Sequence, residues 1–144
     1  MKVKIINKCK YGLPTYKHPG DAGCDLYANI EKPITIGTLE RALVPTGIFI
    51  AVPEGYEMQV RPRSGLAIKH GISVLNSPGT VDEGYRNEVG VILVNLSPLP
   101  FTINPGERIA QAVFAKHETA EWEEVGTLDE TERGTGGFGS TGME

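Results

Sequence analysis

A glycine-rich C-terminal segment is the first part of this sequence that could bind a ligand. It reads Arg133-Gly-Thr-Gly-Gly-Phe-Gly-Ser-Thr-Gly142. Glycine lets backbone N–H groups approach an anion closely, and the Arg133 guanidinium can bind phosphate oxygens in pairs. Phe138 offers a flat face on which a base can stack. By composition alone, a phosphate-binding lid and a flexible, disordered tail are about equally favoured.

A second segment, Pro62-Arg-Ser-Gly-Leu-Ala-Ile-Lys-His-Gly71, follows a predicted strand and opens a short predicted helix. The N-terminus of a helix favours an anion, because its N–H groups are free and its dipole is positive there. Arg63 and Ser64 stand where they could add bonds to phosphate. Simple capping of the helix by Ser64 is the alternative, and this segment alone favours it by about two to one.

A third segment, Gly79-Thr-Val-Asp-Glu-Gly-Tyr-Arg-Asn-Glu88, lies between two strand-like runs. A hairpin with Asp82 and Tyr85 could place a general base beside a ring. A charged, solvated hairpin is the alternative, and this segment alone favours it by about two to one. Asp25 is a weaker candidate, either as the partner of an arginine or as a metal contact through water. Arg108 and Gln111 stand in an otherwise apolar strand, where buried polar groups need partners.

Composition and spacing exclude several other classes of site. No cluster of histidine, cysteine and carboxylate has zinc spacing, no Ser-His-Asp pattern indicates acyl transfer, and no Walker Gly-Lys-Ser/Thr occurs. The net charge of −4 argues against a protein that coats nucleic acid. Cys9 and Cys24 are predicted to be reduced thiols. Because the N-terminus has no long apolar run, we expect no signal peptide, no membrane span and a cytoplasmic location.

The elements that must position these residues are predicted to be short strands. The chain has 144 residues, a length that favours one domain. Its 18 glycines and 10 prolines leave little room for helices. Many short strands indicate an all-β sandwich, jelly roll or barrel with one short helix, near Ser64–His70. We expect strands at 39–44, 46–52, 56–61, 72–75, 89–96, 101–103 and 108–115.

Five segments together resemble the trimeric dUTPase family, the dUTP nucleotidohydrolases. They follow one another in the family's order and span residues 22–142, so the combination is far more specific than any one of them. The segments are Ala22-Gly-Cys-Asp-Leu-Tyr27, Pro62-Arg-Ser-Gly-Leu66, Asn76-Ser-Pro-Gly-Thr-Val-Asp-Glu-Gly-Tyr-Arg86, Gly106-Glu-Arg-Ile-Ala-Gln111 and Arg133-Gly-Thr-Gly-Gly-Phe-Gly-Ser140.

The resemblance implies a fold, an assembly and a reaction. The fold is a distorted jelly-roll or β-clip-like barrel, with a catalytic domain at 1–132 and a flexible lid at 133–144. The assembly is a homotrimer with shared sites at its subunit interfaces, without nucleic-acid or membrane partners. The reaction is Mg²⁺-dependent hydrolysis of dUTP to dUMP and pyrophosphate, by attack of a carboxylate-activated water on the α-phosphate. This activity keeps uracil out of DNA and supplies dUMP for thymidylate synthesis.

The resemblance also implies residue roles. Asp82 is the general base that deprotonates the attacking water, and Asp25 supports the arginines or the water shell of the metal. Tyr85 packs against the deoxyribose, where a ribose 2′-hydroxyl would clash. Backbone groups that bind uracil come from Asn76 and the hairpin at 79–85, including Gly79 and Val81. The residues near the phosphates are Arg63, Ser64, Gly65, Gln111, Arg133, Gly139, Ser140 and Thr141, and Phe138 stacks on uracil.

Two positions depart from the commonest form of the family's hairpin, and two rival functions remain. Gly84 replaces a frequent acidic residue and Asn87 replaces a frequent glycine, which puts the local geometry of the hairpin in question. The related dCTP deaminases are disfavoured because Ile92 stands where they have a catalytic glutamate and Ile68 where they have an arginine. A non-catalytic jelly-roll module would not account for Asp82, Tyr85 and the tail together.

Overall fold

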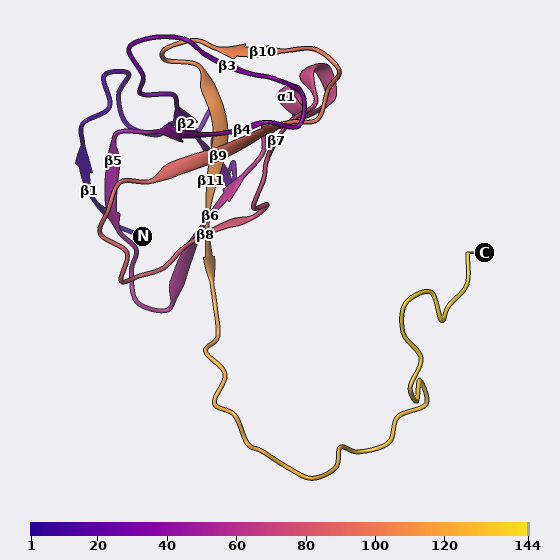
Figure 1. Ribbon diagram of the computed structural model, residues 1–144. Coiled ribbons are helices and arrows are strands. Elements are labelled where there is room, and N and C mark those ends of the chain that lie inside the picture. Colours follow the sequence, from indigo (N-terminus) through magenta and orange to yellow (C-terminus); the bar gives the residue numbers. More distant parts are fainter. Residues whose placement is uncertain (144) are drawn as a thin grey trace.

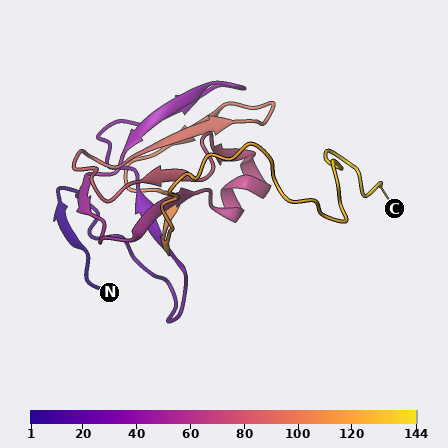
Figure 2. The ribbon, with the colours of Figure 1, turned by 90° about the horizontal axis from the view of Figure 1, so that it is seen from below.

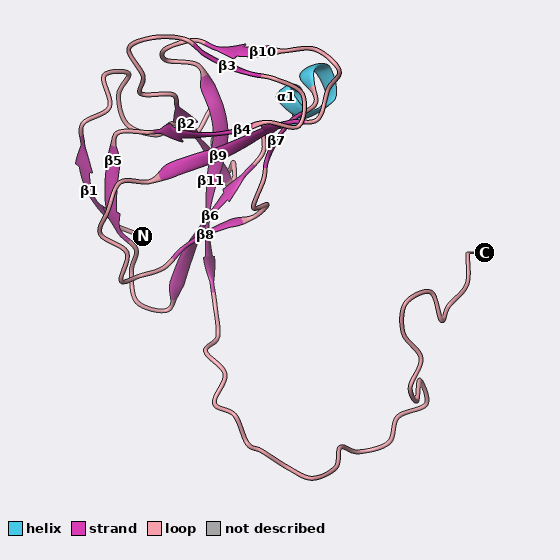
Figure 3. Ribbon diagram, in the orientation of Figure 1, coloured by secondary structure: helices cyan, strands magenta, loops and turns pink. Residues whose placement is uncertain are grey.

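A computed structural model describes residues 1–143 and shows a small β-rich body from which a long tail departs (Figure 1). The body contains short strands and one helix, α1 (Ser64–His70), at one corner (Figure 3). The strands are β1 (Lys4–Asn7), β2 (Gly23–Tyr27), β3 (Ile34–Ile36), β4 (Arg41–Pro45), β5 (Ile48–Ala51), β6 (Tyr56–Arg61), β7 (Ile72–Val74), β8 (Gly79–Val81), β9 (Gly90–Asn95), β10 (Phe101–Ile103) and β11 (Arg108–Lys116).

Strand β11 organises the largest sheet, whose order is β2-β11-β6-β8. A second sheet has the order β4-β9-β7, and two pairs, β1-β5 and β3-β10, complete the body. Every pairing is antiparallel. Because β11 lies between β2 and β6, Gln111 stands opposite Asp25 on one side and Arg61 on the other. The prediction of an all-β fold with one short helix is confirmed.

The core lies between the inward faces of these sheets, and the predicted strand at 56–61 alternates in burial. Met58 and Val60 are buried, whereas Gln59 is half-buried and Arg61 is exposed. In β9, Val91 and Leu93 are buried on one face, and Val94 on the other face is only 7% exposed. The nearly continuous apolar run therefore follows from burial on both faces along much of the strand.

Several strands begin later than predicted, for local backbone reasons. The run expected at 46–52 begins at Ile48, because Gly47 takes a left-handed conformation (φ 73°). A Cβ atom at that position would lie 2.8 Å from the backbone of Cys9. The run expected at 39–44 begins at Arg41, since Leu39 also has a positive φ of 64°. Both residues turn the chain and cannot extend a strand.

The two cysteines are free, as predicted. Cys9 is half-buried and Cys24 is buried in the core. Burial raises the pKa of the Cys24 thiol, which keeps it protonated at neutral pH.

The tail begins at the end of β11. No strand or helix is present in residues 117–143, and the C-terminal end lies away from the strands in two perpendicular views (Figures 1 and 2). Its large apolar side chains are exposed, among them Trp122 at 90% and Leu128 at 85%. The regular body thus stops at Lys116, before the predicted boundary at residue 132. That boundary stays a prediction, and the last residue of the predicted lid, Glu144, lies outside the described residues.

Within residues 1–143, no helix combines the length and the apolar character needed to cross a membrane. The cytoplasmic location expected from the sequence stays a prediction.

Ile103 tests the contribution of the core. Its side chain is fully buried, so an Ile103→Ala change should lower the free energy of unfolding by roughly 2–5 kcal/mol. Ile68→Ala is the matched control, because Ile68 is 85% exposed on α1 and should change stability by less than about 0.5 kcal/mol. Urea unfolding of both variants at one chain concentration measures the difference. Equal effects would contradict this assignment of the core.

Candidate active site

Asp25 on β2 holds two arginines. Its carboxylate lies 3.1 Å from Arg63 Nε and 3.6 Å from Arg108 Nη1. Arg63 also donates from Nη1 to the backbone carbonyl of Arg108 at 3.2 Å. The Asp25 side chain is 14% exposed, so bulk water screens the cluster only partly. The sequence left two roles for Asp25, the partner of an arginine or a metal contact through water. The structure shows Asp25 paired with two arginines.

The backbone places Gln111 against this cluster. Gln111 stands opposite Asp25 in the β11-β2 register and donates from Nε2 to the carbonyl of Pro62 at 2.9 Å. A Cβ atom on Gly23 would lie 2.1 Å from Gln111 Oε1, so Gly23 makes room for this side chain. Packing against Gln111 therefore explains why a glycine stands two residues before Asp25.

Ser64 is the first residue of α1 and leaves its hydroxyl uncommitted. The helix is capped at Arg63 without any side-chain hydrogen bond. Among residues 1–143 the Ser64 hydroxyl makes no hydrogen bond, so the capping alternative favoured by the segment alone is wrong. His70 lies at the other end of α1, with the centroid of its ring 5.0 Å from that of Phe101. It lines neither of the two cavities described next.

Two cavities meet at these residues. One, of about 510 Å³, lies between the end of β6 and the first turn of α1. The other, of about 190 Å³, lies on the side of β2 and is lined mostly by polar residues. Both are lined by Arg63, Ser64 and Gln111, and the smaller also by Asp25 and Gly65. Five predicted site residues thus gather around space suited to an anion.

The predicted hairpin is a β-strand followed by a turn. Strand β8 pairs with β6, and Asp82 follows it with an exposed side chain. The Tyr85 N–H donates to the carbonyl of Asp82 at 3.1 Å, and the Tyr85 hydroxyl donates to that of Glu88 at 2.7 Å. A Cβ atom on Gly79 would lie 3.2 Å from the Val60 side chain, which explains a glycine there. The hairpin holds Asp82 and Tyr85 on one tight turn.

The two departures in this hairpin disturb nothing that the structure describes. A Cβ atom on Gly84 would meet no atom within 4 Å. The Asn87 side chain accepts a hydrogen bond from the Glu88 N–H at 2.8 Å. The turn between Asp82 and Tyr85 closes with both residues in place.

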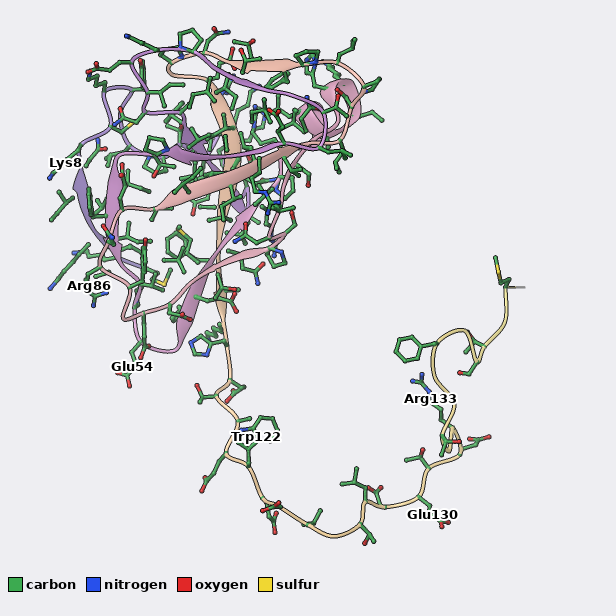
Figure 4. The ribbon with its side chains drawn as sticks, in the orientation of Figure 1. Lys8, Glu54, Arg86, Trp122, Glu130 and Arg133 are labelled. Carbon is green, nitrogen blue, oxygen red and sulfur yellow. The ribbon has the colours of Figure 1, made fainter. Side chains whose placement is uncertain are left out.

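In a single chain the residues of the predicted site lie in three separate places: around the two cavities, on the hairpin and on the tail. Asp82, Asn76 and Tyr85 line neither of the two cavities beside Asp25, and Tyr85 instead borders a separate cavity of about 430 Å³. Arg133 lies on the tail, away from the body (Figure 4), where its Nε donates to the Gly136 carbonyl. Phe138 and the neighbouring Gly139, Ser140 and Thr141 are exposed.

Comparison with known proteins assigns the family. A family model described as dUTPase matches residues 10–142. The chain belongs to the dUTPase family. The deoxyuridine 5'-triphosphate nucleotidohydrolase of Fusobacterium nucleatum is 58% identical and aligns over 99% of this chain and 97% of its own. That of Finegoldia magna is 55% identical over 99% of both chains.

Solved structures agree with this assignment. The dUTPase of Staphylococcus bacteriophage 80alpha with dUPNHPP is 26% identical and superposes with a TM-score of 0.85 over 99% of each chain. A mutant of the same phage enzyme with dUpNHpp superposes at 0.88 over 99% of each chain, with 24% identity. The predicted family, enzyme class and reaction, hydrolysis of dUTP to dUMP and pyrophosphate, are confirmed. The deaminase and the non-catalytic module are thereby set aside.

Sequence reasoning missed several residues that line the cavities of this dUTPase. Gln59 and Arg61 border the larger one, and the Arg61 guanidinium donates twice to Gln59 Oε1, at 2.9 and 2.7 Å. Lys17, His18 and Asp21 border the smaller one. Arg61 stands directly before the second segment and could have been found there. The loop at 17–21 has no spacing signal, because only the fold brings it beside Ser64.

No metal cage is present in residues 1–143, where no three histidine, cysteine, aspartate or glutamate side chains converge. The carboxylate of Asp25 is shared between two arginines. This donor set fits a cation that arrives with phosphates and keeps much of its water shell, as Mg²⁺ does.

Asp25→Asn tests the arginine cluster. The change keeps the shape of the side chain but leaves two neighbouring arginines without their anion. Because the cluster is partly buried, the free energy of unfolding should fall by about 1–2 kcal/mol, and kcat/KM for dUTP should fall with it. Glu31→Gln is the control, since the Lys10–Glu31 pair is exposed and should not affect the melting temperature. Thermal unfolding and steady-state kinetics of both variants make the comparison. An Asp25→Asn variant with unchanged stability and unchanged kcat/KM would refute this role of Asp25.

Proposed function

We propose that this chain hydrolyses dUTP by an Asp82-activated water, with the triphosphate held beside the Asp25–Arg63–Arg108 cluster. The observation that supports this proposal best is that Arg63, Ser64 and Gln111 line two neighbouring cavities together. All three have groups that bind phosphate oxygens, and a carboxylate fixes the arginine in place.

Phosphate binding uses donors that the fold has already oriented. Arg63 is restrained by Asp25 and by the Arg108 carbonyl, so it loses little freedom when an anion binds. The Ser64 hydroxyl is uncommitted, and Gly65 lets the backbone approach closely. Gln111 is held through Pro62. Such preorganised donors stabilise charge that develops on the phosphates.

Asp82 acts as the general base. Its exposed carboxylate accepts a proton from a water molecule, whose oxygen forms a bond to the α-phosphorus. The bond from that phosphorus to the bridging oxygen breaks, and pyrophosphate leaves with the electron pair. The products are dUMP and pyrophosphate, and no other reactant is needed.

Sugar and base recognition belong to the hairpin. Tyr85 is fixed at both ends, by its N–H to Asp82 and by its hydroxyl to Glu88, so its ring presents a rigid face. We assign this face to the deoxyribose, where a 2′-hydroxyl would not fit. Backbone groups of Asn76, Gly79 and Val81 bind uracil, and Phe138 of the tail stacks on its other side.

Mg²⁺ is the proposed cofactor. When bound, it neutralises phosphate charge and holds the phosphate chain in one arrangement. Asp25 would reach it through water, because both carboxylate oxygens already face arginines. The residues of the site then have to orient the nucleotide and the water.

Assembly into a homotrimer would complete the site. One chain alone leaves Asp82 and the tail apart from the phosphate cavities. The same chain exposes large apolar side chains around the β4-β9-β7 sheet, namely Leu43, Leu75 and Leu96 at 69%, 46% and 61%. Such a surface is typical of contacts between subunits. We propose that neighbouring copies cover it and bring the three parts of the site together.

The substrate range and Asp82 can be tested in one assay. With Mg²⁺, the protein should release pyrophosphate from dUTP and much less from dCTP, dTTP or UTP. Asp82→Asn should still bind dUTP but lose roughly 10²–10⁴-fold in kcat. Glu83→Gln is the control at the neighbouring position. Glu83 accepts a hydrogen bond from the Gly55 N–H, and a glutamine keeps a side-chain oxygen that can accept the same bond. Near-normal turnover by Asp82→Asn would remove Asp82 from the role of base, and equal activity on UTP would remove Tyr85 from sugar selection.

Mixed assemblies test whether sites are shared. Deletion of residues 133–144 should leave a folded protein with little activity, as should Asp82→Asn. Unfolding and refolding the two variants together should restore part of the activity, because some sites then combine Asp82 from one chain with the tail of another. Separately refolded variants are the control. A trimer by mass measurement without any recovery would show that each chain supplies its own base and tail.

A further inference from the structure

We propose that Lys17 is an additional phosphate-binding residue of this dUTPase, presented by the loop before β2. This inference rests on the proposed function, since it deepens the description of the same phosphate cavity. It is independent of Asp82 and of the tail, because Lys17 lies beside residues of its own chain.

The smaller cavity places Lys17 next to the phosphate donors. Its lining includes Lys17, His18 and Asp21 from the loop, together with Ser64, Gly65 and Gln111. A cavity of about 190 Å³ is small, so an anion that contacts Ser64 and Gly65 is within reach of a flexible lysine side chain. The loop therefore forms one wall of the site.

The loop is held in position at several points. The Asp25 N–H donates to the Thr15 carbonyl at 2.8 Å, which ties the start of the loop to the arginine-binding residue itself. The tip is a turn in which the His18 N–H donates to Asp21 Oδ2 at 2.9 Å and the Asp21 N–H donates to the His18 carbonyl at 3.2 Å. Gly20 supplies the positive φ of 85° that the turn requires.

Tyr16 anchors the residue next to Lys17. Its side chain lines an apolar cavity of about 250 Å³ together with Cys24 and Met58. Tyr16 remains 52% exposed overall, and its partial burial together with the Cys24 thiol raises the pKa of its hydroxyl. The contact of Tyr16 with this apolar cavity and the closed turn at 18–21 restrain the backbone on either side of Lys17.

Lys17 has a charge that no described neighbour neutralises. It forms no ion pair within residues 1–143, whereas Lys10 is paired with Glu31 at 3.0 Å. The positive charges of Arg63 and Arg108 are offset in part by Asp25. Asp21, the other acidic residue at this cavity, faces the His18 N–H and is not within ion-pair distance of Lys17. An ammonium group here would attract a polyanion and contact one of its oxygens.

Lys17→Met, Lys17→Arg and the control Lys32→Met form the test. Lys32 is exposed and lines none of the cavities described above. For Lys17→Met, we expect KM for dUTP and the inhibition constant of pyrophosphate to rise about tenfold, with kcat changed less than about threefold. Lys17→Arg should restore most of the affinity, and Lys32→Met should match the parent protein. The effect should shrink at high salt, because a charge interaction is screened.

The outcomes separate this inference from the proposed function. If the parent protein hydrolyses dUTP and Lys17→Met has the same KM and the same pyrophosphate inhibition, Lys17 is not a phosphate ligand and the proposed function stands. If the parent protein releases no pyrophosphate from dUTP, the proposed function fails. Calorimetric binding of pyrophosphate to the parent and to Lys17→Met then still decides the inference: weaker binding by the variant supports it, and equal binding overturns it.

Discussion

The site depends on one carboxylate placed between two arginines. Arg63 and Arg108 would repel each other without Asp25, and only the bond from Arg63 to the Arg108 carbonyl would remain to orient them. The position of Asp25 follows from β11, which pairs with β2 on one side and with β6 on the other. Asp25, Arg108 and the segment that follows Arg61 are therefore neighbours by strand register. A one-residue slip of β11 would turn Gln111 away from the cavity and Ala112 toward it.

The molecule divides the work between rigid and movable parts. Apart from Lys17 and the residues of the tail, the residues proposed to bind phosphates lie on core strands or at the first turn of α1, where packing holds them. The residues proposed to close over the nucleotide lie beyond the last strand, where Phe138 is fully exposed. This division suits a site that must bind a polyanion firmly and then exclude water from it. The hairpin with Asp82 is intermediate, since β8 fixes its start and an exposed turn forms its tip.

Local sequence patterns predicted those elements whose bounds depend mainly on neighbouring residues. The strand predicted at 56–61 and the helix predicted at Ser64–His70 agree with the structure at both ends. Strand β1 was not predicted, because all four of its residues are exposed and it exists through its pairing with β5. The cavity formed by Lys17 with Ser64 was not predicted either, since it needs residues 47 positions apart to meet. Recognition of Asp82 came from the combination of five segments, and the fold of one chain leaves it apart from the cavities it is proposed to serve.

The distribution of charge resolves an apparent conflict in a protein of net charge −4 that binds a triphosphate. Residues 117–144 contain eight acidic side chains and one arginine, which leaves ten acidic and thirteen basic residues in 1–116. The strand body is therefore positive and the tail strongly negative. Seven of the eight acidic residues of the tail precede Arg133, and residues 133–143 contain none. Because acidic residues close to the phosphates would weaken binding, the proposed lid requires residues 118–132 to pass at a distance from the nucleotide. Only residues 133–143 are free of acidic side chains and thus electrostatically suited to touch it, which agrees with the proposed lid that begins at Arg133.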